Sequence, residues 1–372
     1  MELKLTLPEL LPHLNSFYNF FEDCEDITQY YLKKKLERIS EGDYESVDNK
    51  VYNFSQISPS DLNFELVKVS GGDFNSIVTQ IATFPIESQL GRRMVWGLKE
   101  TTTNTYVGFV RIASPVSSIK PRNDHFGQPI PLQKVNDHIY NGQTIVPVQP
   151  FGFNYLGGKL MALVCLSNEV REEFNKQYGT NILVFETTSL YGDSKSSSMY
   201  DGLEPYLKYK GHTESENYLF PTDEVYYPLR DLCRQHYGIE SENGMVVKRK
   251  GSSPKMREYQ QVLRIVKEHL KVQDPEELKK FNEFLKLTKS KQRKRFYMSN
   301  FGYENVSQHI LNGDQLIRKN PEKYDLKNLI DYWKKKSTKR WEKLKEEGRL
   351  RTDLETYTVQ SLTEGIQFET IR

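Results

Sequence analysis

The sequence contains few cysteines, and their spacing gives them no common role. Cys24, Cys165 and Cys233 are the three cysteines of the 372-residue chain. Because they are odd in number and far apart, a disulfide framework, a zinc site and a redox motif are not expected. We therefore expect the protein to work in a reducing cytoplasm.

Long apolar runs are also missing. No stretch approaches the roughly 18 consecutive apolar residues that a membrane span requires. The segment from Met1 to His13 carries Glu2 and Glu9 and has no apolar core, so we expect no secretory signal. The length instead suggests two soluble domains, at about 100 to 200 residues each, with enough apolar material for a buried core.

Several motifs that would define an enzyme class are absent. The sequence has no Walker A motif, no Rossmann fingerprint and no Gly-x-Ser-x-Gly elbow. The seven histidines are scattered, and we expect His125, His138 and His212 to be structural or exposed. No paired carboxylates have metal-ligand spacing, so no metal site is expected and a nuclease is the weakest candidate.

The net charge of +2 hides a strong asymmetry along the chain. The segment from Lys248 to Leu350 has 28 Lys and Arg against 14 Asp and Glu, so the remaining residues are together acidic. A charge run can be only a solvated helical face. Here the cations stand beside aromatic residues, which favours contact with nucleic acid, DNA more than RNA.

Two basic clusters carry this prediction. The first precedes Phe296 and Tyr297, and its cations suit a phosphate backbone while the rings suit bases. In the second, Trp333 shares a helical face with basic residues at spacings of three and four. The cations expected to bind nucleic acid are Lys289, Lys291, Arg293, Lys294 and Arg295 in the first cluster and Lys334, Lys336 and Arg340 in the second.

The periodicity predicts a mixed fold. Two helices are expected between Leu7 and Ser40, and a hairpin at 94–98 and 106–112. A strand at 144–148, a helix from Leu160 to Tyr178 and a strand at 182–186 would form a βαβ unit. We expect an α+β protein divided into a helical extension (1–60), a core (61–247), a basic helical region (248–350) and a tail (351–372).

A glycine-rich loop connects the strand at 144–148 to the following helix. Glycines let a ligand approach the backbone, and free N–H groups at a helix start attract phosphate. The alternative is a turn needed only for tight packing of helix on strand. The candidate ligand-binding residues are Gln149, Gly152, Asn154, Gly157, Gly158 and Lys159.

The run from Ile145 to Leu160, together with Phe185-Glu-Thr-Thr-Ser-Leu-Tyr-Gly192, resembles the phage-encoded branch of the family that contains the Druantia anti-phage protein DruA. The similarity extends from about Leu90 to Lys343. It includes Arg295-Phe-Tyr and Tyr332-Trp-Lys. The resemblance implies a role in phage defence or counter-defence, in the host cytoplasm if the gene is carried by a phage.

The order of elements is also similar to that of the GNAT acyltransferases, whose pyrophosphate-binding loop lies between the fourth strand and a helix. The signature of that loop would be Gln149-x-x-Gly152-x-Asn154, and the resemblance implies acetyl-CoA or another phosphate-bearing cofactor. The segment from Glu186 to Gly211 resembles the Mom-type DNA-modifying branch of that superfamily. By position, the catalytic candidates this implies are Ser189, Tyr191, Asp193 and Tyr200.

Two hypotheses therefore stand for the function. One is a GNAT-like transferase that modifies DNA bases, with Tyr191 or Tyr200 as acid or base. The other is a DNA-binding protein that uses a GNAT-like scaffold without catalysis, because a fold alone does not guarantee chemistry.

Overall fold

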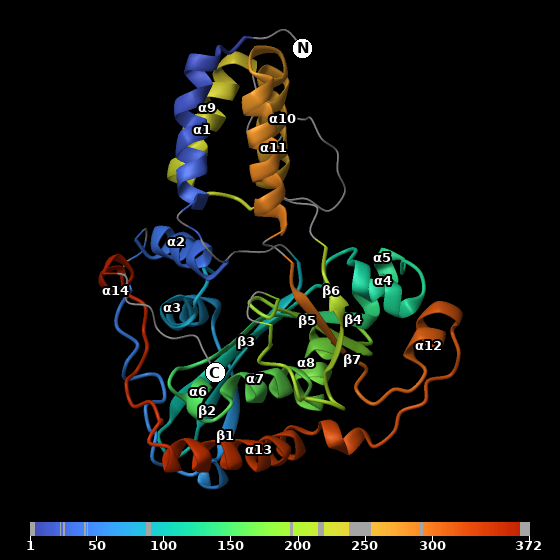
Figure 1. Cartoon of the computed structure of the whole chain (residues 1–372). Helices are drawn as coiled ribbons and strands as arrows, with labels where there is room; N and C mark the ends of the chain where they lie inside the picture. The colour runs from blue at the N-terminus through green and yellow to red at the C-terminus, as the bar shows by residue number, and fades with distance from the viewer. Residues whose placement is uncertain are drawn as a thin grey trace. The chain divides into compact units, whose positions relative to one another are not determined.

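The structure is a computed structural model that describes most of the chain (Figure 1). The described residues are 4–22, 24, 27–40, 42, 44–86, 91–193, 196–214, 219–237, 254–290 and 293–364. In this part of the chain, no helix combines the length and the apolar character needed to cross a membrane.

The contacts between residues divide the chain into two compact units. The helical unit comprises Met1–Glu37 and Glu214–Arg293, and the sheet unit comprises Arg38–Thr213 and Lys294–Arg372. The expected boundaries at residues 60, 247 and 350 were placed where composition changes, and none coincides with a unit boundary. Residue 247 itself lies outside the described residues.

The helical unit contains α1 (Leu7–Glu22), the start of α2 (Ile27–Ser40), α9 (Asp223–Tyr237), α10 (Pro254–Gln273) and α11 (Pro275–Ser290). Figure 1 shows α1, α9, α10 and α11 side by side, and each contacts at least one of the others. Phe17 of α1 is fully buried and lies against the rings of Tyr259, Phe281 and Phe284. The two helices predicted between Leu7 and Ser40 are confirmed.

Among its described residues, the sheet unit has seven strands in the order β1-β2-β3-β4-β5-β7-β6. All neighbouring pairs are antiparallel except β4 and β5, which are parallel. The predicted hairpin is β2 with β3, and the predicted βαβ unit is β4, its following helices and β5. The strands are β1 (Phe64–Lys68), β2 (Arg93–Glu100), β3 (Thr105–Ala113), β4 (Ile139–Pro147), β5 (Val184–Ser189), β6 (Lys208–His212) and β7 (Arg295–Ser299).

The helix predicted from Leu160 to Tyr178 is in fact two helices, α7 (Gly157–Cys165) and α8 (Asn168–Tyr178). Ser167 stands between them with an extended backbone, and its hydroxyl accepts a hydrogen bond from the Val170 N–H at 3.3 Å. This N-cap starts a new helix direction inside an otherwise continuous apolar pattern. A short helix, α6 (Phe151–Asn154), precedes them.

Further helices complete the sheet unit. The core lies largely between the sheet and the pair α7 and α13, where α13 packs on α7 (Figure 1). The fold is α+β, as predicted. The remaining helices are η1 (Pro59–Asp61), α3 (Gly71–Ile81), α4 (Lys120–Phe126), α5 (Leu132–His138), α12 (Val306–Asn312), η2 (Pro321–Tyr324), α13 (Leu326–Glu346) and α14 (Val359–Thr363).

The larger part of the helical unit is inserted between β6 and β7, which are sheet neighbours. The chain leaves the sheet after Thr213 and returns at Lys294. The Thr213 N–H donates to the Lys294 carbonyl at 2.8 Å, and the Lys294 N–H donates to the Thr213 hydroxyl at 3.1 Å. The two ends of the insertion are therefore bonded to each other within the sheet unit.

Candidate functional site

The long basic helix α13 is fixed to the glycine loop by its buried face. Its buried residues Leu329, Trp333, Ser337, Trp341 and Leu344 recur at spacings of three and four, which places them on one side of the helix. The Trp333 indole N–H donates to the carbonyls of residues 155 and 156 at 2.9 and 3.2 Å, and the Ser337 hydroxyl donates to the first of these at 2.6 Å. The loop and the helix thus form one packed assembly.

This packing corrects one part of the sequence interpretation. Trp333 is only 1% exposed, and Phe296 and Tyr297 are equally buried. The rings were expected to stack on bases beside the cations, but all three belong to the core, so they are not available to a nucleic acid. The helical spacing placed Trp333 near Lys336 and Arg340, but it could not show that the side of α13 that carries Trp333 packs against the core.

The predicted cofactor loop lies where expected, between β4 and α7, but its side chains make internal contacts. The Gln149 side-chain oxygen accepts from the Phe153 N–H at 2.9 Å. The fully buried Asn154 donates to the Arg351 carbonyl at 2.8 Å and accepts from its N–H at 3.0 Å. Both polar side chains of the expected signature therefore hold the loop itself.

The glycines of the loop permit close packing. A Cβ atom on Gly152 would lie 2.5 Å from the Gln149 side chain, and one on Gly157 would lie 2.7 Å from the Phe151 ring. A Cβ on Gly158 would lie 2.7 Å from the Met199 sulfur. At Gly157, where the neighbours are a ring and the Gly152 backbone, packing itself requires the absence of a side chain, whereas Gln149 and Met199 have flexible side chains that can move.

Beside the start of α7, the surface is hollowed and strongly basic. This lysine hollow has a volume of about 470 Å³ and is lined by Leu156, Lys159, Asp201, Gly202, Tyr332, Lys335, Lys336 and Lys339. In the described part of the chain, no carboxylate forms an ion pair with Lys335, Lys336 or Lys339. The Lys336 ammonium lies 5.2 Å from the centre of the Tyr332 ring.

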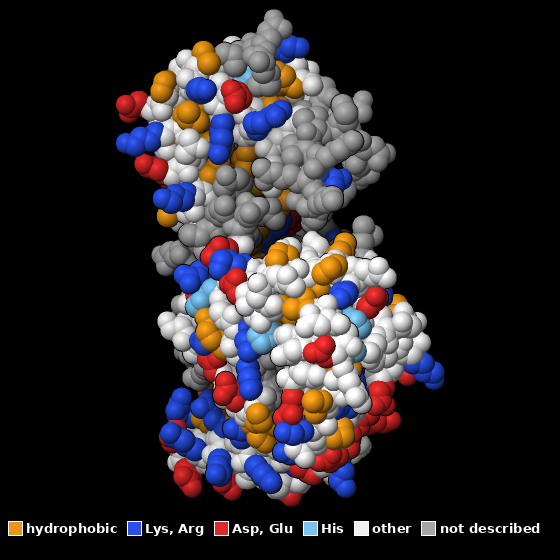
Figure 2. All heavy atoms as spheres, turned by 90° about the vertical axis from the view of Figure 1, so that its right-hand side faces the viewer, with side chains coloured by type: hydrophobic (Ala, Val, Ile, Leu, Met, Phe, Trp, Pro, Cys, Tyr) orange, Lys and Arg blue, Asp and Glu red, His pale blue; other side chains and the backbone are white. Residues whose placement is uncertain are grey.

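Lys159, a predicted cofactor ligand, lies in this hollow but is held by the backbone. Its ammonium donates to the Met199 carbonyl at 3.2 Å and to the Asp201 carbonyl. Lys and Arg side chains also gather along the lower margin of the face in Figure 2, at the height of α13 in Figure 1, with Asp and Glu among them. The hollow is where cations converge on one concave surface.

The other basic residues of the second predicted cluster serve mainly structural contacts. The Lys334 ammonium donates to the Ser60 carbonyl at 3.0 Å. The Arg340 guanidinium lies 5.0 Å from the centre of the Phe153 ring. Burial, and then the charge of Arg349, lowers the pKa of Arg340.

The first predicted cluster is only partly described. Lys291 and the side chain of Lys289 lie outside the described residues. Arg293 is exposed at the end of the helical unit, and Lys294 begins the return to the sheet. Arg295 is engaged, because its guanidinium pairs with the Asp201 carboxylate at 3.2 Å and lies 4.7 Å from the centre of the Tyr209 ring.

A second group of polar side chains gathers where β5 ends beside β7 and β6. Ser189 pairs in register with Arg295, which also pairs with His212 on the other side. A Cβ on Gly192 would lie 2.6 Å from the Ser189 hydroxyl and 3.1 Å from the Arg295 side chain. We call this group the polar cluster, and it comprises Ser189, Asp193, Asp201, Tyr209, His212 and Arg295.

Within the polar cluster, three side chains form a hydrogen-bonded relay. Asp193 lies 2.8 Å from His212 Nε2, and the Tyr209 hydroxyl lies 2.7 Å from His212 Nδ1. Tyr209 is 40% exposed, so this residue of the relay lies at the surface. A carboxylate that orients a histidine beside a hydroxyl is an arrangement suited to proton transfer.

The structure separates the predicted catalytic residues. Ser189 and Asp193 belong to the polar cluster, but the Tyr191 hydroxyl instead bonds the Thr83 hydroxyl at 2.7 Å. Tyr200 is 4% exposed and packs against the Tyr297 ring at 5.3 Å, and burial raises its pKa. A substrate cannot reach the Tyr200 hydroxyl without a rearrangement.

Tyr209 and His212 were not selected from the sequence. His212 was expected to be structural or exposed, and it is the central member of the relay. The sequence shows that His212 is three residues from Tyr209, but their partner Asp193 lies in a different segment, the loop after β5. The described residues contain no group of three or more His, Cys, Asp or Glu that could hold a metal ion.

Comparison with known proteins gives a partial match. The family model of Druantia protein DruA matches residues 20–196. Druantia protein DruA of Escherichia coli (strain UMEA 4076-1) is 24% identical to this chain over 202 residues, which is 48% of this chain and 49% of the relative. The chain thus spans about half the length of the curated relative that it matches. No solved structure matches significantly.

The resemblance to this family is confirmed as a similarity, with a different extent from the one expected. The matched range begins at residue 20, well before Leu90, and ends at residue 196, well before Lys343. It includes the glycine loop, Ser189 and Asp193. It leaves out Tyr209, His212, Arg295 and the whole of α13.

Proposed function

We propose that this chain takes part in anti-phage defence and that it does so by binding nucleic acid through the lysine hollow. The first half of the proposal is supported by the similarity to Druantia protein DruA over residues 20–196. The second is supported by a single observation: Lys335, Lys336 and Lys339 line one concave surface without a carboxylate partner in the described part of the chain.

The charge arrangement suits a polyanion. A phosphate backbone releases condensed counterions when lysines neutralise it, so binding of this kind is favourable and strongly dependent on salt. Lys335, Lys336 and Lys339 lie on adjacent turns of a rigid helix whose opposite face is held by Trp333 and Ser337. The backbone positions of the three lysines are therefore fixed relative to one another, whereas the aromatic residues nearby are buried in the core. Recognition would rest on phosphates more than on stacked bases.

The test is the affinity for duplex DNA at several salt concentrations. We expect log affinity to fall linearly with log salt, and the triple variant Lys335→Ala, Lys336→Ala, Lys339→Ala to bind at least tenfold more weakly with a shallower slope. The matched control is Lys50→Ala, Lys176→Ala, Lys323→Ala, which removes three exposed lysines of the same unit outside the hollow. Equal losses in the two variants would reduce the effect to net charge and reject the hollow.

A second candidate function is supported by a different observation. The parallel pair β4 and β5 is joined through the glycine loop and α7, in the order of elements that a GNAT-like transferase requires, and the relay lies at the far end of β5. A bound acetyl-CoA, or another phosphate-bearing cofactor, would supply the group to be transferred to a DNA base.

The residues of the glycine loop fit such a cofactor only in part. Gln149 and Asn154 are engaged in holding the loop. Lys159 and the first turn of α7 border the lysine hollow, so a pyrophosphate would be held there. Tyr209 would donate or accept the proton at the base, with His212 carrying it and Asp193 orienting the imidazole.

The two candidates differ in what they leave on DNA. Digestion of DNA from cells that express the protein, followed by mass measurement of the nucleosides, detects a transferred group. A transferase predicts an added mass that disappears in Tyr209→Phe and in His212→Asn, while DNA affinity stays unchanged. Unmodified nucleosides in cells that are protected from phage would reject the transferase and leave nucleic-acid binding as the function.

A further inference from the structure

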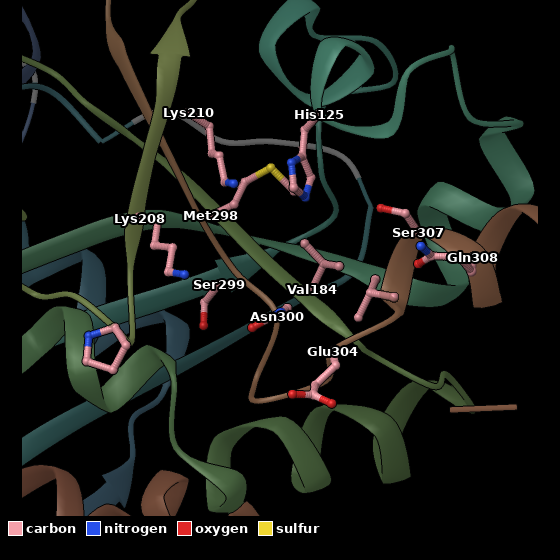
Figure 3. Close-up of a pocket in the computed structure, with 12 residues that line it drawn as sticks. His125, Val184, Lys208, Lys210, Met298, Ser299, Asn300, Glu304, Ser307 and Gln308 are labelled. Carbon is pink, nitrogen blue, oxygen red and sulfur yellow. The ribbon is translucent and has the colours of Figure 1, made fainter. Parts of the chain in front are cut away.

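A second and smaller hollow lies on another part of the sheet unit. It has a volume of about 230 Å³ and is formed by β6, by the start of β5, by the end of β7 with the loop after it, by α4 and by the beginning of α12. Figure 3 shows the side chains of Lys208, Lys210, His125 and Ser299 around its centre, with Glu304 on the opposite side.

The backbone explains why two lysines share this hollow. Lys208 and Lys210 are two positions apart on β6, so their side chains leave the same face of the sheet. Lys208 stands in register opposite Met298 of β7, and both line the hollow. Figure 3 shows the Lys210 ammonium directed towards Met298, with the His125 ring on the far side of the sulfur.

The positive charges in this hollow repel one another. In the described part of the chain, neither Lys208 nor Lys210 forms an ion pair with a carboxylate. Glu304 is the acidic residue of the lining, and it already pairs with Lys319 at 2.6 Å. Desolvation, and then the charge of Lys208, lowers the pKa of Lys210. The Glu204 carboxylate opposes this shift more weakly, without forming an ion pair with Lys210 in the described part of the chain. Two ammonium groups therefore share the hollow with no carboxylate paired to either of them.

We propose that this hollow binds the phosphoryl group of a small phosphomonoester. The dianionic phosphate would be held by the ammonium groups of Lys208 and Lys210, with the His125 imidazole beyond the Met298 sulfur in the wall of the hollow. The Ser299 hydroxyl and the Asn300 amide border the same space and offer further hydrogen bonds. The three free oxygens of a phosphomonoester can accept hydrogen bonds from several of these donors at once. A carboxylate has only two oxygens and would satisfy fewer of them.

The size and the walls of the hollow limit the rest of the ligand. Pockets for drug-sized ligands measure about 300 to 1,000 Å³, so this one takes a phosphoryl group with a small carbon body. Val184, Met298 and Val306 provide apolar contact for that body. The lysine hollow is lined by entirely different residues, so the two sites can be tested separately.

The test uses inorganic phosphate and ribose 5-phosphate as probes, with calorimetry at constant ionic strength. We expect saturable binding of both, with the ester bound more tightly. The variant Lys208→Gln, Lys210→Gln keeps unbranched-stem polar side chains but removes both charges, and we expect at least a tenfold loss of affinity. Lys68→Gln, Lys99→Gln is the control, because it removes two strand lysines from the other end of the same sheet and should bind as the parent does.

Further arms separate the outcomes. The lysine-hollow triple variant should bind phosphate unchanged, so the failure of one site does not imply the failure of the other. A short oligonucleotide with a 5′-phosphate, compared with the same oligonucleotide without it, distinguishes the end of a nucleic acid from a small ester as the source of the phosphoryl group. Competition by the phosphorylated form alone, together with ribose 5-phosphate that binds no more tightly than inorganic phosphate, would assign the site to nucleic-acid ends and reject the small ester. The proposal would be overturned if titration with chloride gave the same binding signal as titration with phosphate. It would also be overturned if the double variant bound phosphate as the parent does.

Discussion

Arg122 and Glu186 form an ion pair inside the sheet unit, with side chains that are 0% and 2% exposed. One guanidinium nitrogen of Arg122 lies 3.0 and 3.1 Å from the two carboxylate oxygens. The other donates to the carbonyls of Val116 and Ser117 at 2.8 and 2.9 Å. The pair thus fixes α4 and the preceding loop to β5, the strand whose end carries the polar cluster.

Replacing Arg122 alone should be strongly destabilising. In Arg122→Met, Glu186 stays buried without its counter-charge, and a broken buried pair costs about 3 to 5 kcal/mol. Urea unfolding followed by circular dichroism measures this loss. The double variant Arg122→Met, Glu186→Leu should recover part of the stability, because a buried pair can be replaced by apolar residues of similar volume, although the Val116 and Ser117 carbonyls still lose their donor. A double variant as unstable as the single one would contradict this account.

The same variant should change how stability depends on pH. Burial already raises the pKa of Glu186 to about 7, and Arg122 opposes this shift. Without Arg122 the folded-state pKa rises further, so the unfolded state loses its proton first as pH increases. The stability of Arg122→Met should therefore be greatest below about pH 4.5, should fall with pH as that of the parent does up to about pH 7, and should continue to fall above pH 7, where the parent levels off. Parallel curves for the two proteins would reject this explanation.

Asn154 should be needed for stability, whatever binds at the glycine loop. Asn154→Ala leaves the N–H and the carbonyl of Arg351 without their bonds, and unsatisfied buried groups cost about 1 to 3 kcal/mol each. Thermal unfolding should show a clear loss. Asn328→Ala, which removes an exposed amide bonded to the Glu322 carbonyl, is the control and should shift the midpoint little.

Gly108 should not tolerate a methyl group. A Cβ at this position of β3 would lie 2.8 Å from the Val146 carbonyl oxygen and 2.7 Å from the Met161 sulfur. Gly108→Ala should cost about 1 to 3 kcal/mol, the usual range for overpacking. Gly72→Ala in α3 is the control, because its nearest atom would be 3.9 Å away, and we expect it to be neutral or slightly stabilising.

The three cysteines should be inert in the folded protein. Cys24, Cys165 and Cys233 are all buried, and burial raises the pKa of the Cys165 and Cys233 thiols, that of Cys233 to about 12. A thiol reagent at pH 8 should react slowly in native buffer and with all three cysteines in denaturant. Rapid reaction of one cysteine in native buffer would show that its surroundings open.

Local patterns in the sequence predicted much of the sheet unit. The alternation in β2 and β3 and the apolar runs of β4 and β5 are short-range signals, and each corresponds to a strand. The division between α7 and α8 was missed, because the apolar spacing continues across Ser167 and only the cap reveals the break. The apolar spacing therefore predicted that the segment is helical, but it did not predict that the helix axis changes direction at Ser167.

The polar cluster could not be predicted in full because it depends on long-range pairing. Ser189 and Asp193 follow β5, but Tyr209 and His212 reach them only because β7 pairs with both β5 and β6. Trp333 shows the same limit. Its spacing from Lys336 and Arg340 is helical in either case, and only the packing of α13 on α7 decides that the ring is inside.

The bond between Thr213 and Lys294 makes the sheet unit accessible to protein engineering. Because the two residues already face each other across an antiparallel ladder, a short glycine-containing hairpin turn could replace residues 214–293 with little loss of loop entropy. A continuous polypeptide from Arg38 to Arg372 with that deletion would retain the lysine hollow, the polar cluster and the smaller hollow lined by Lys208 and Lys210. Such a miniature would show which of the chain's biological properties need the helices at all.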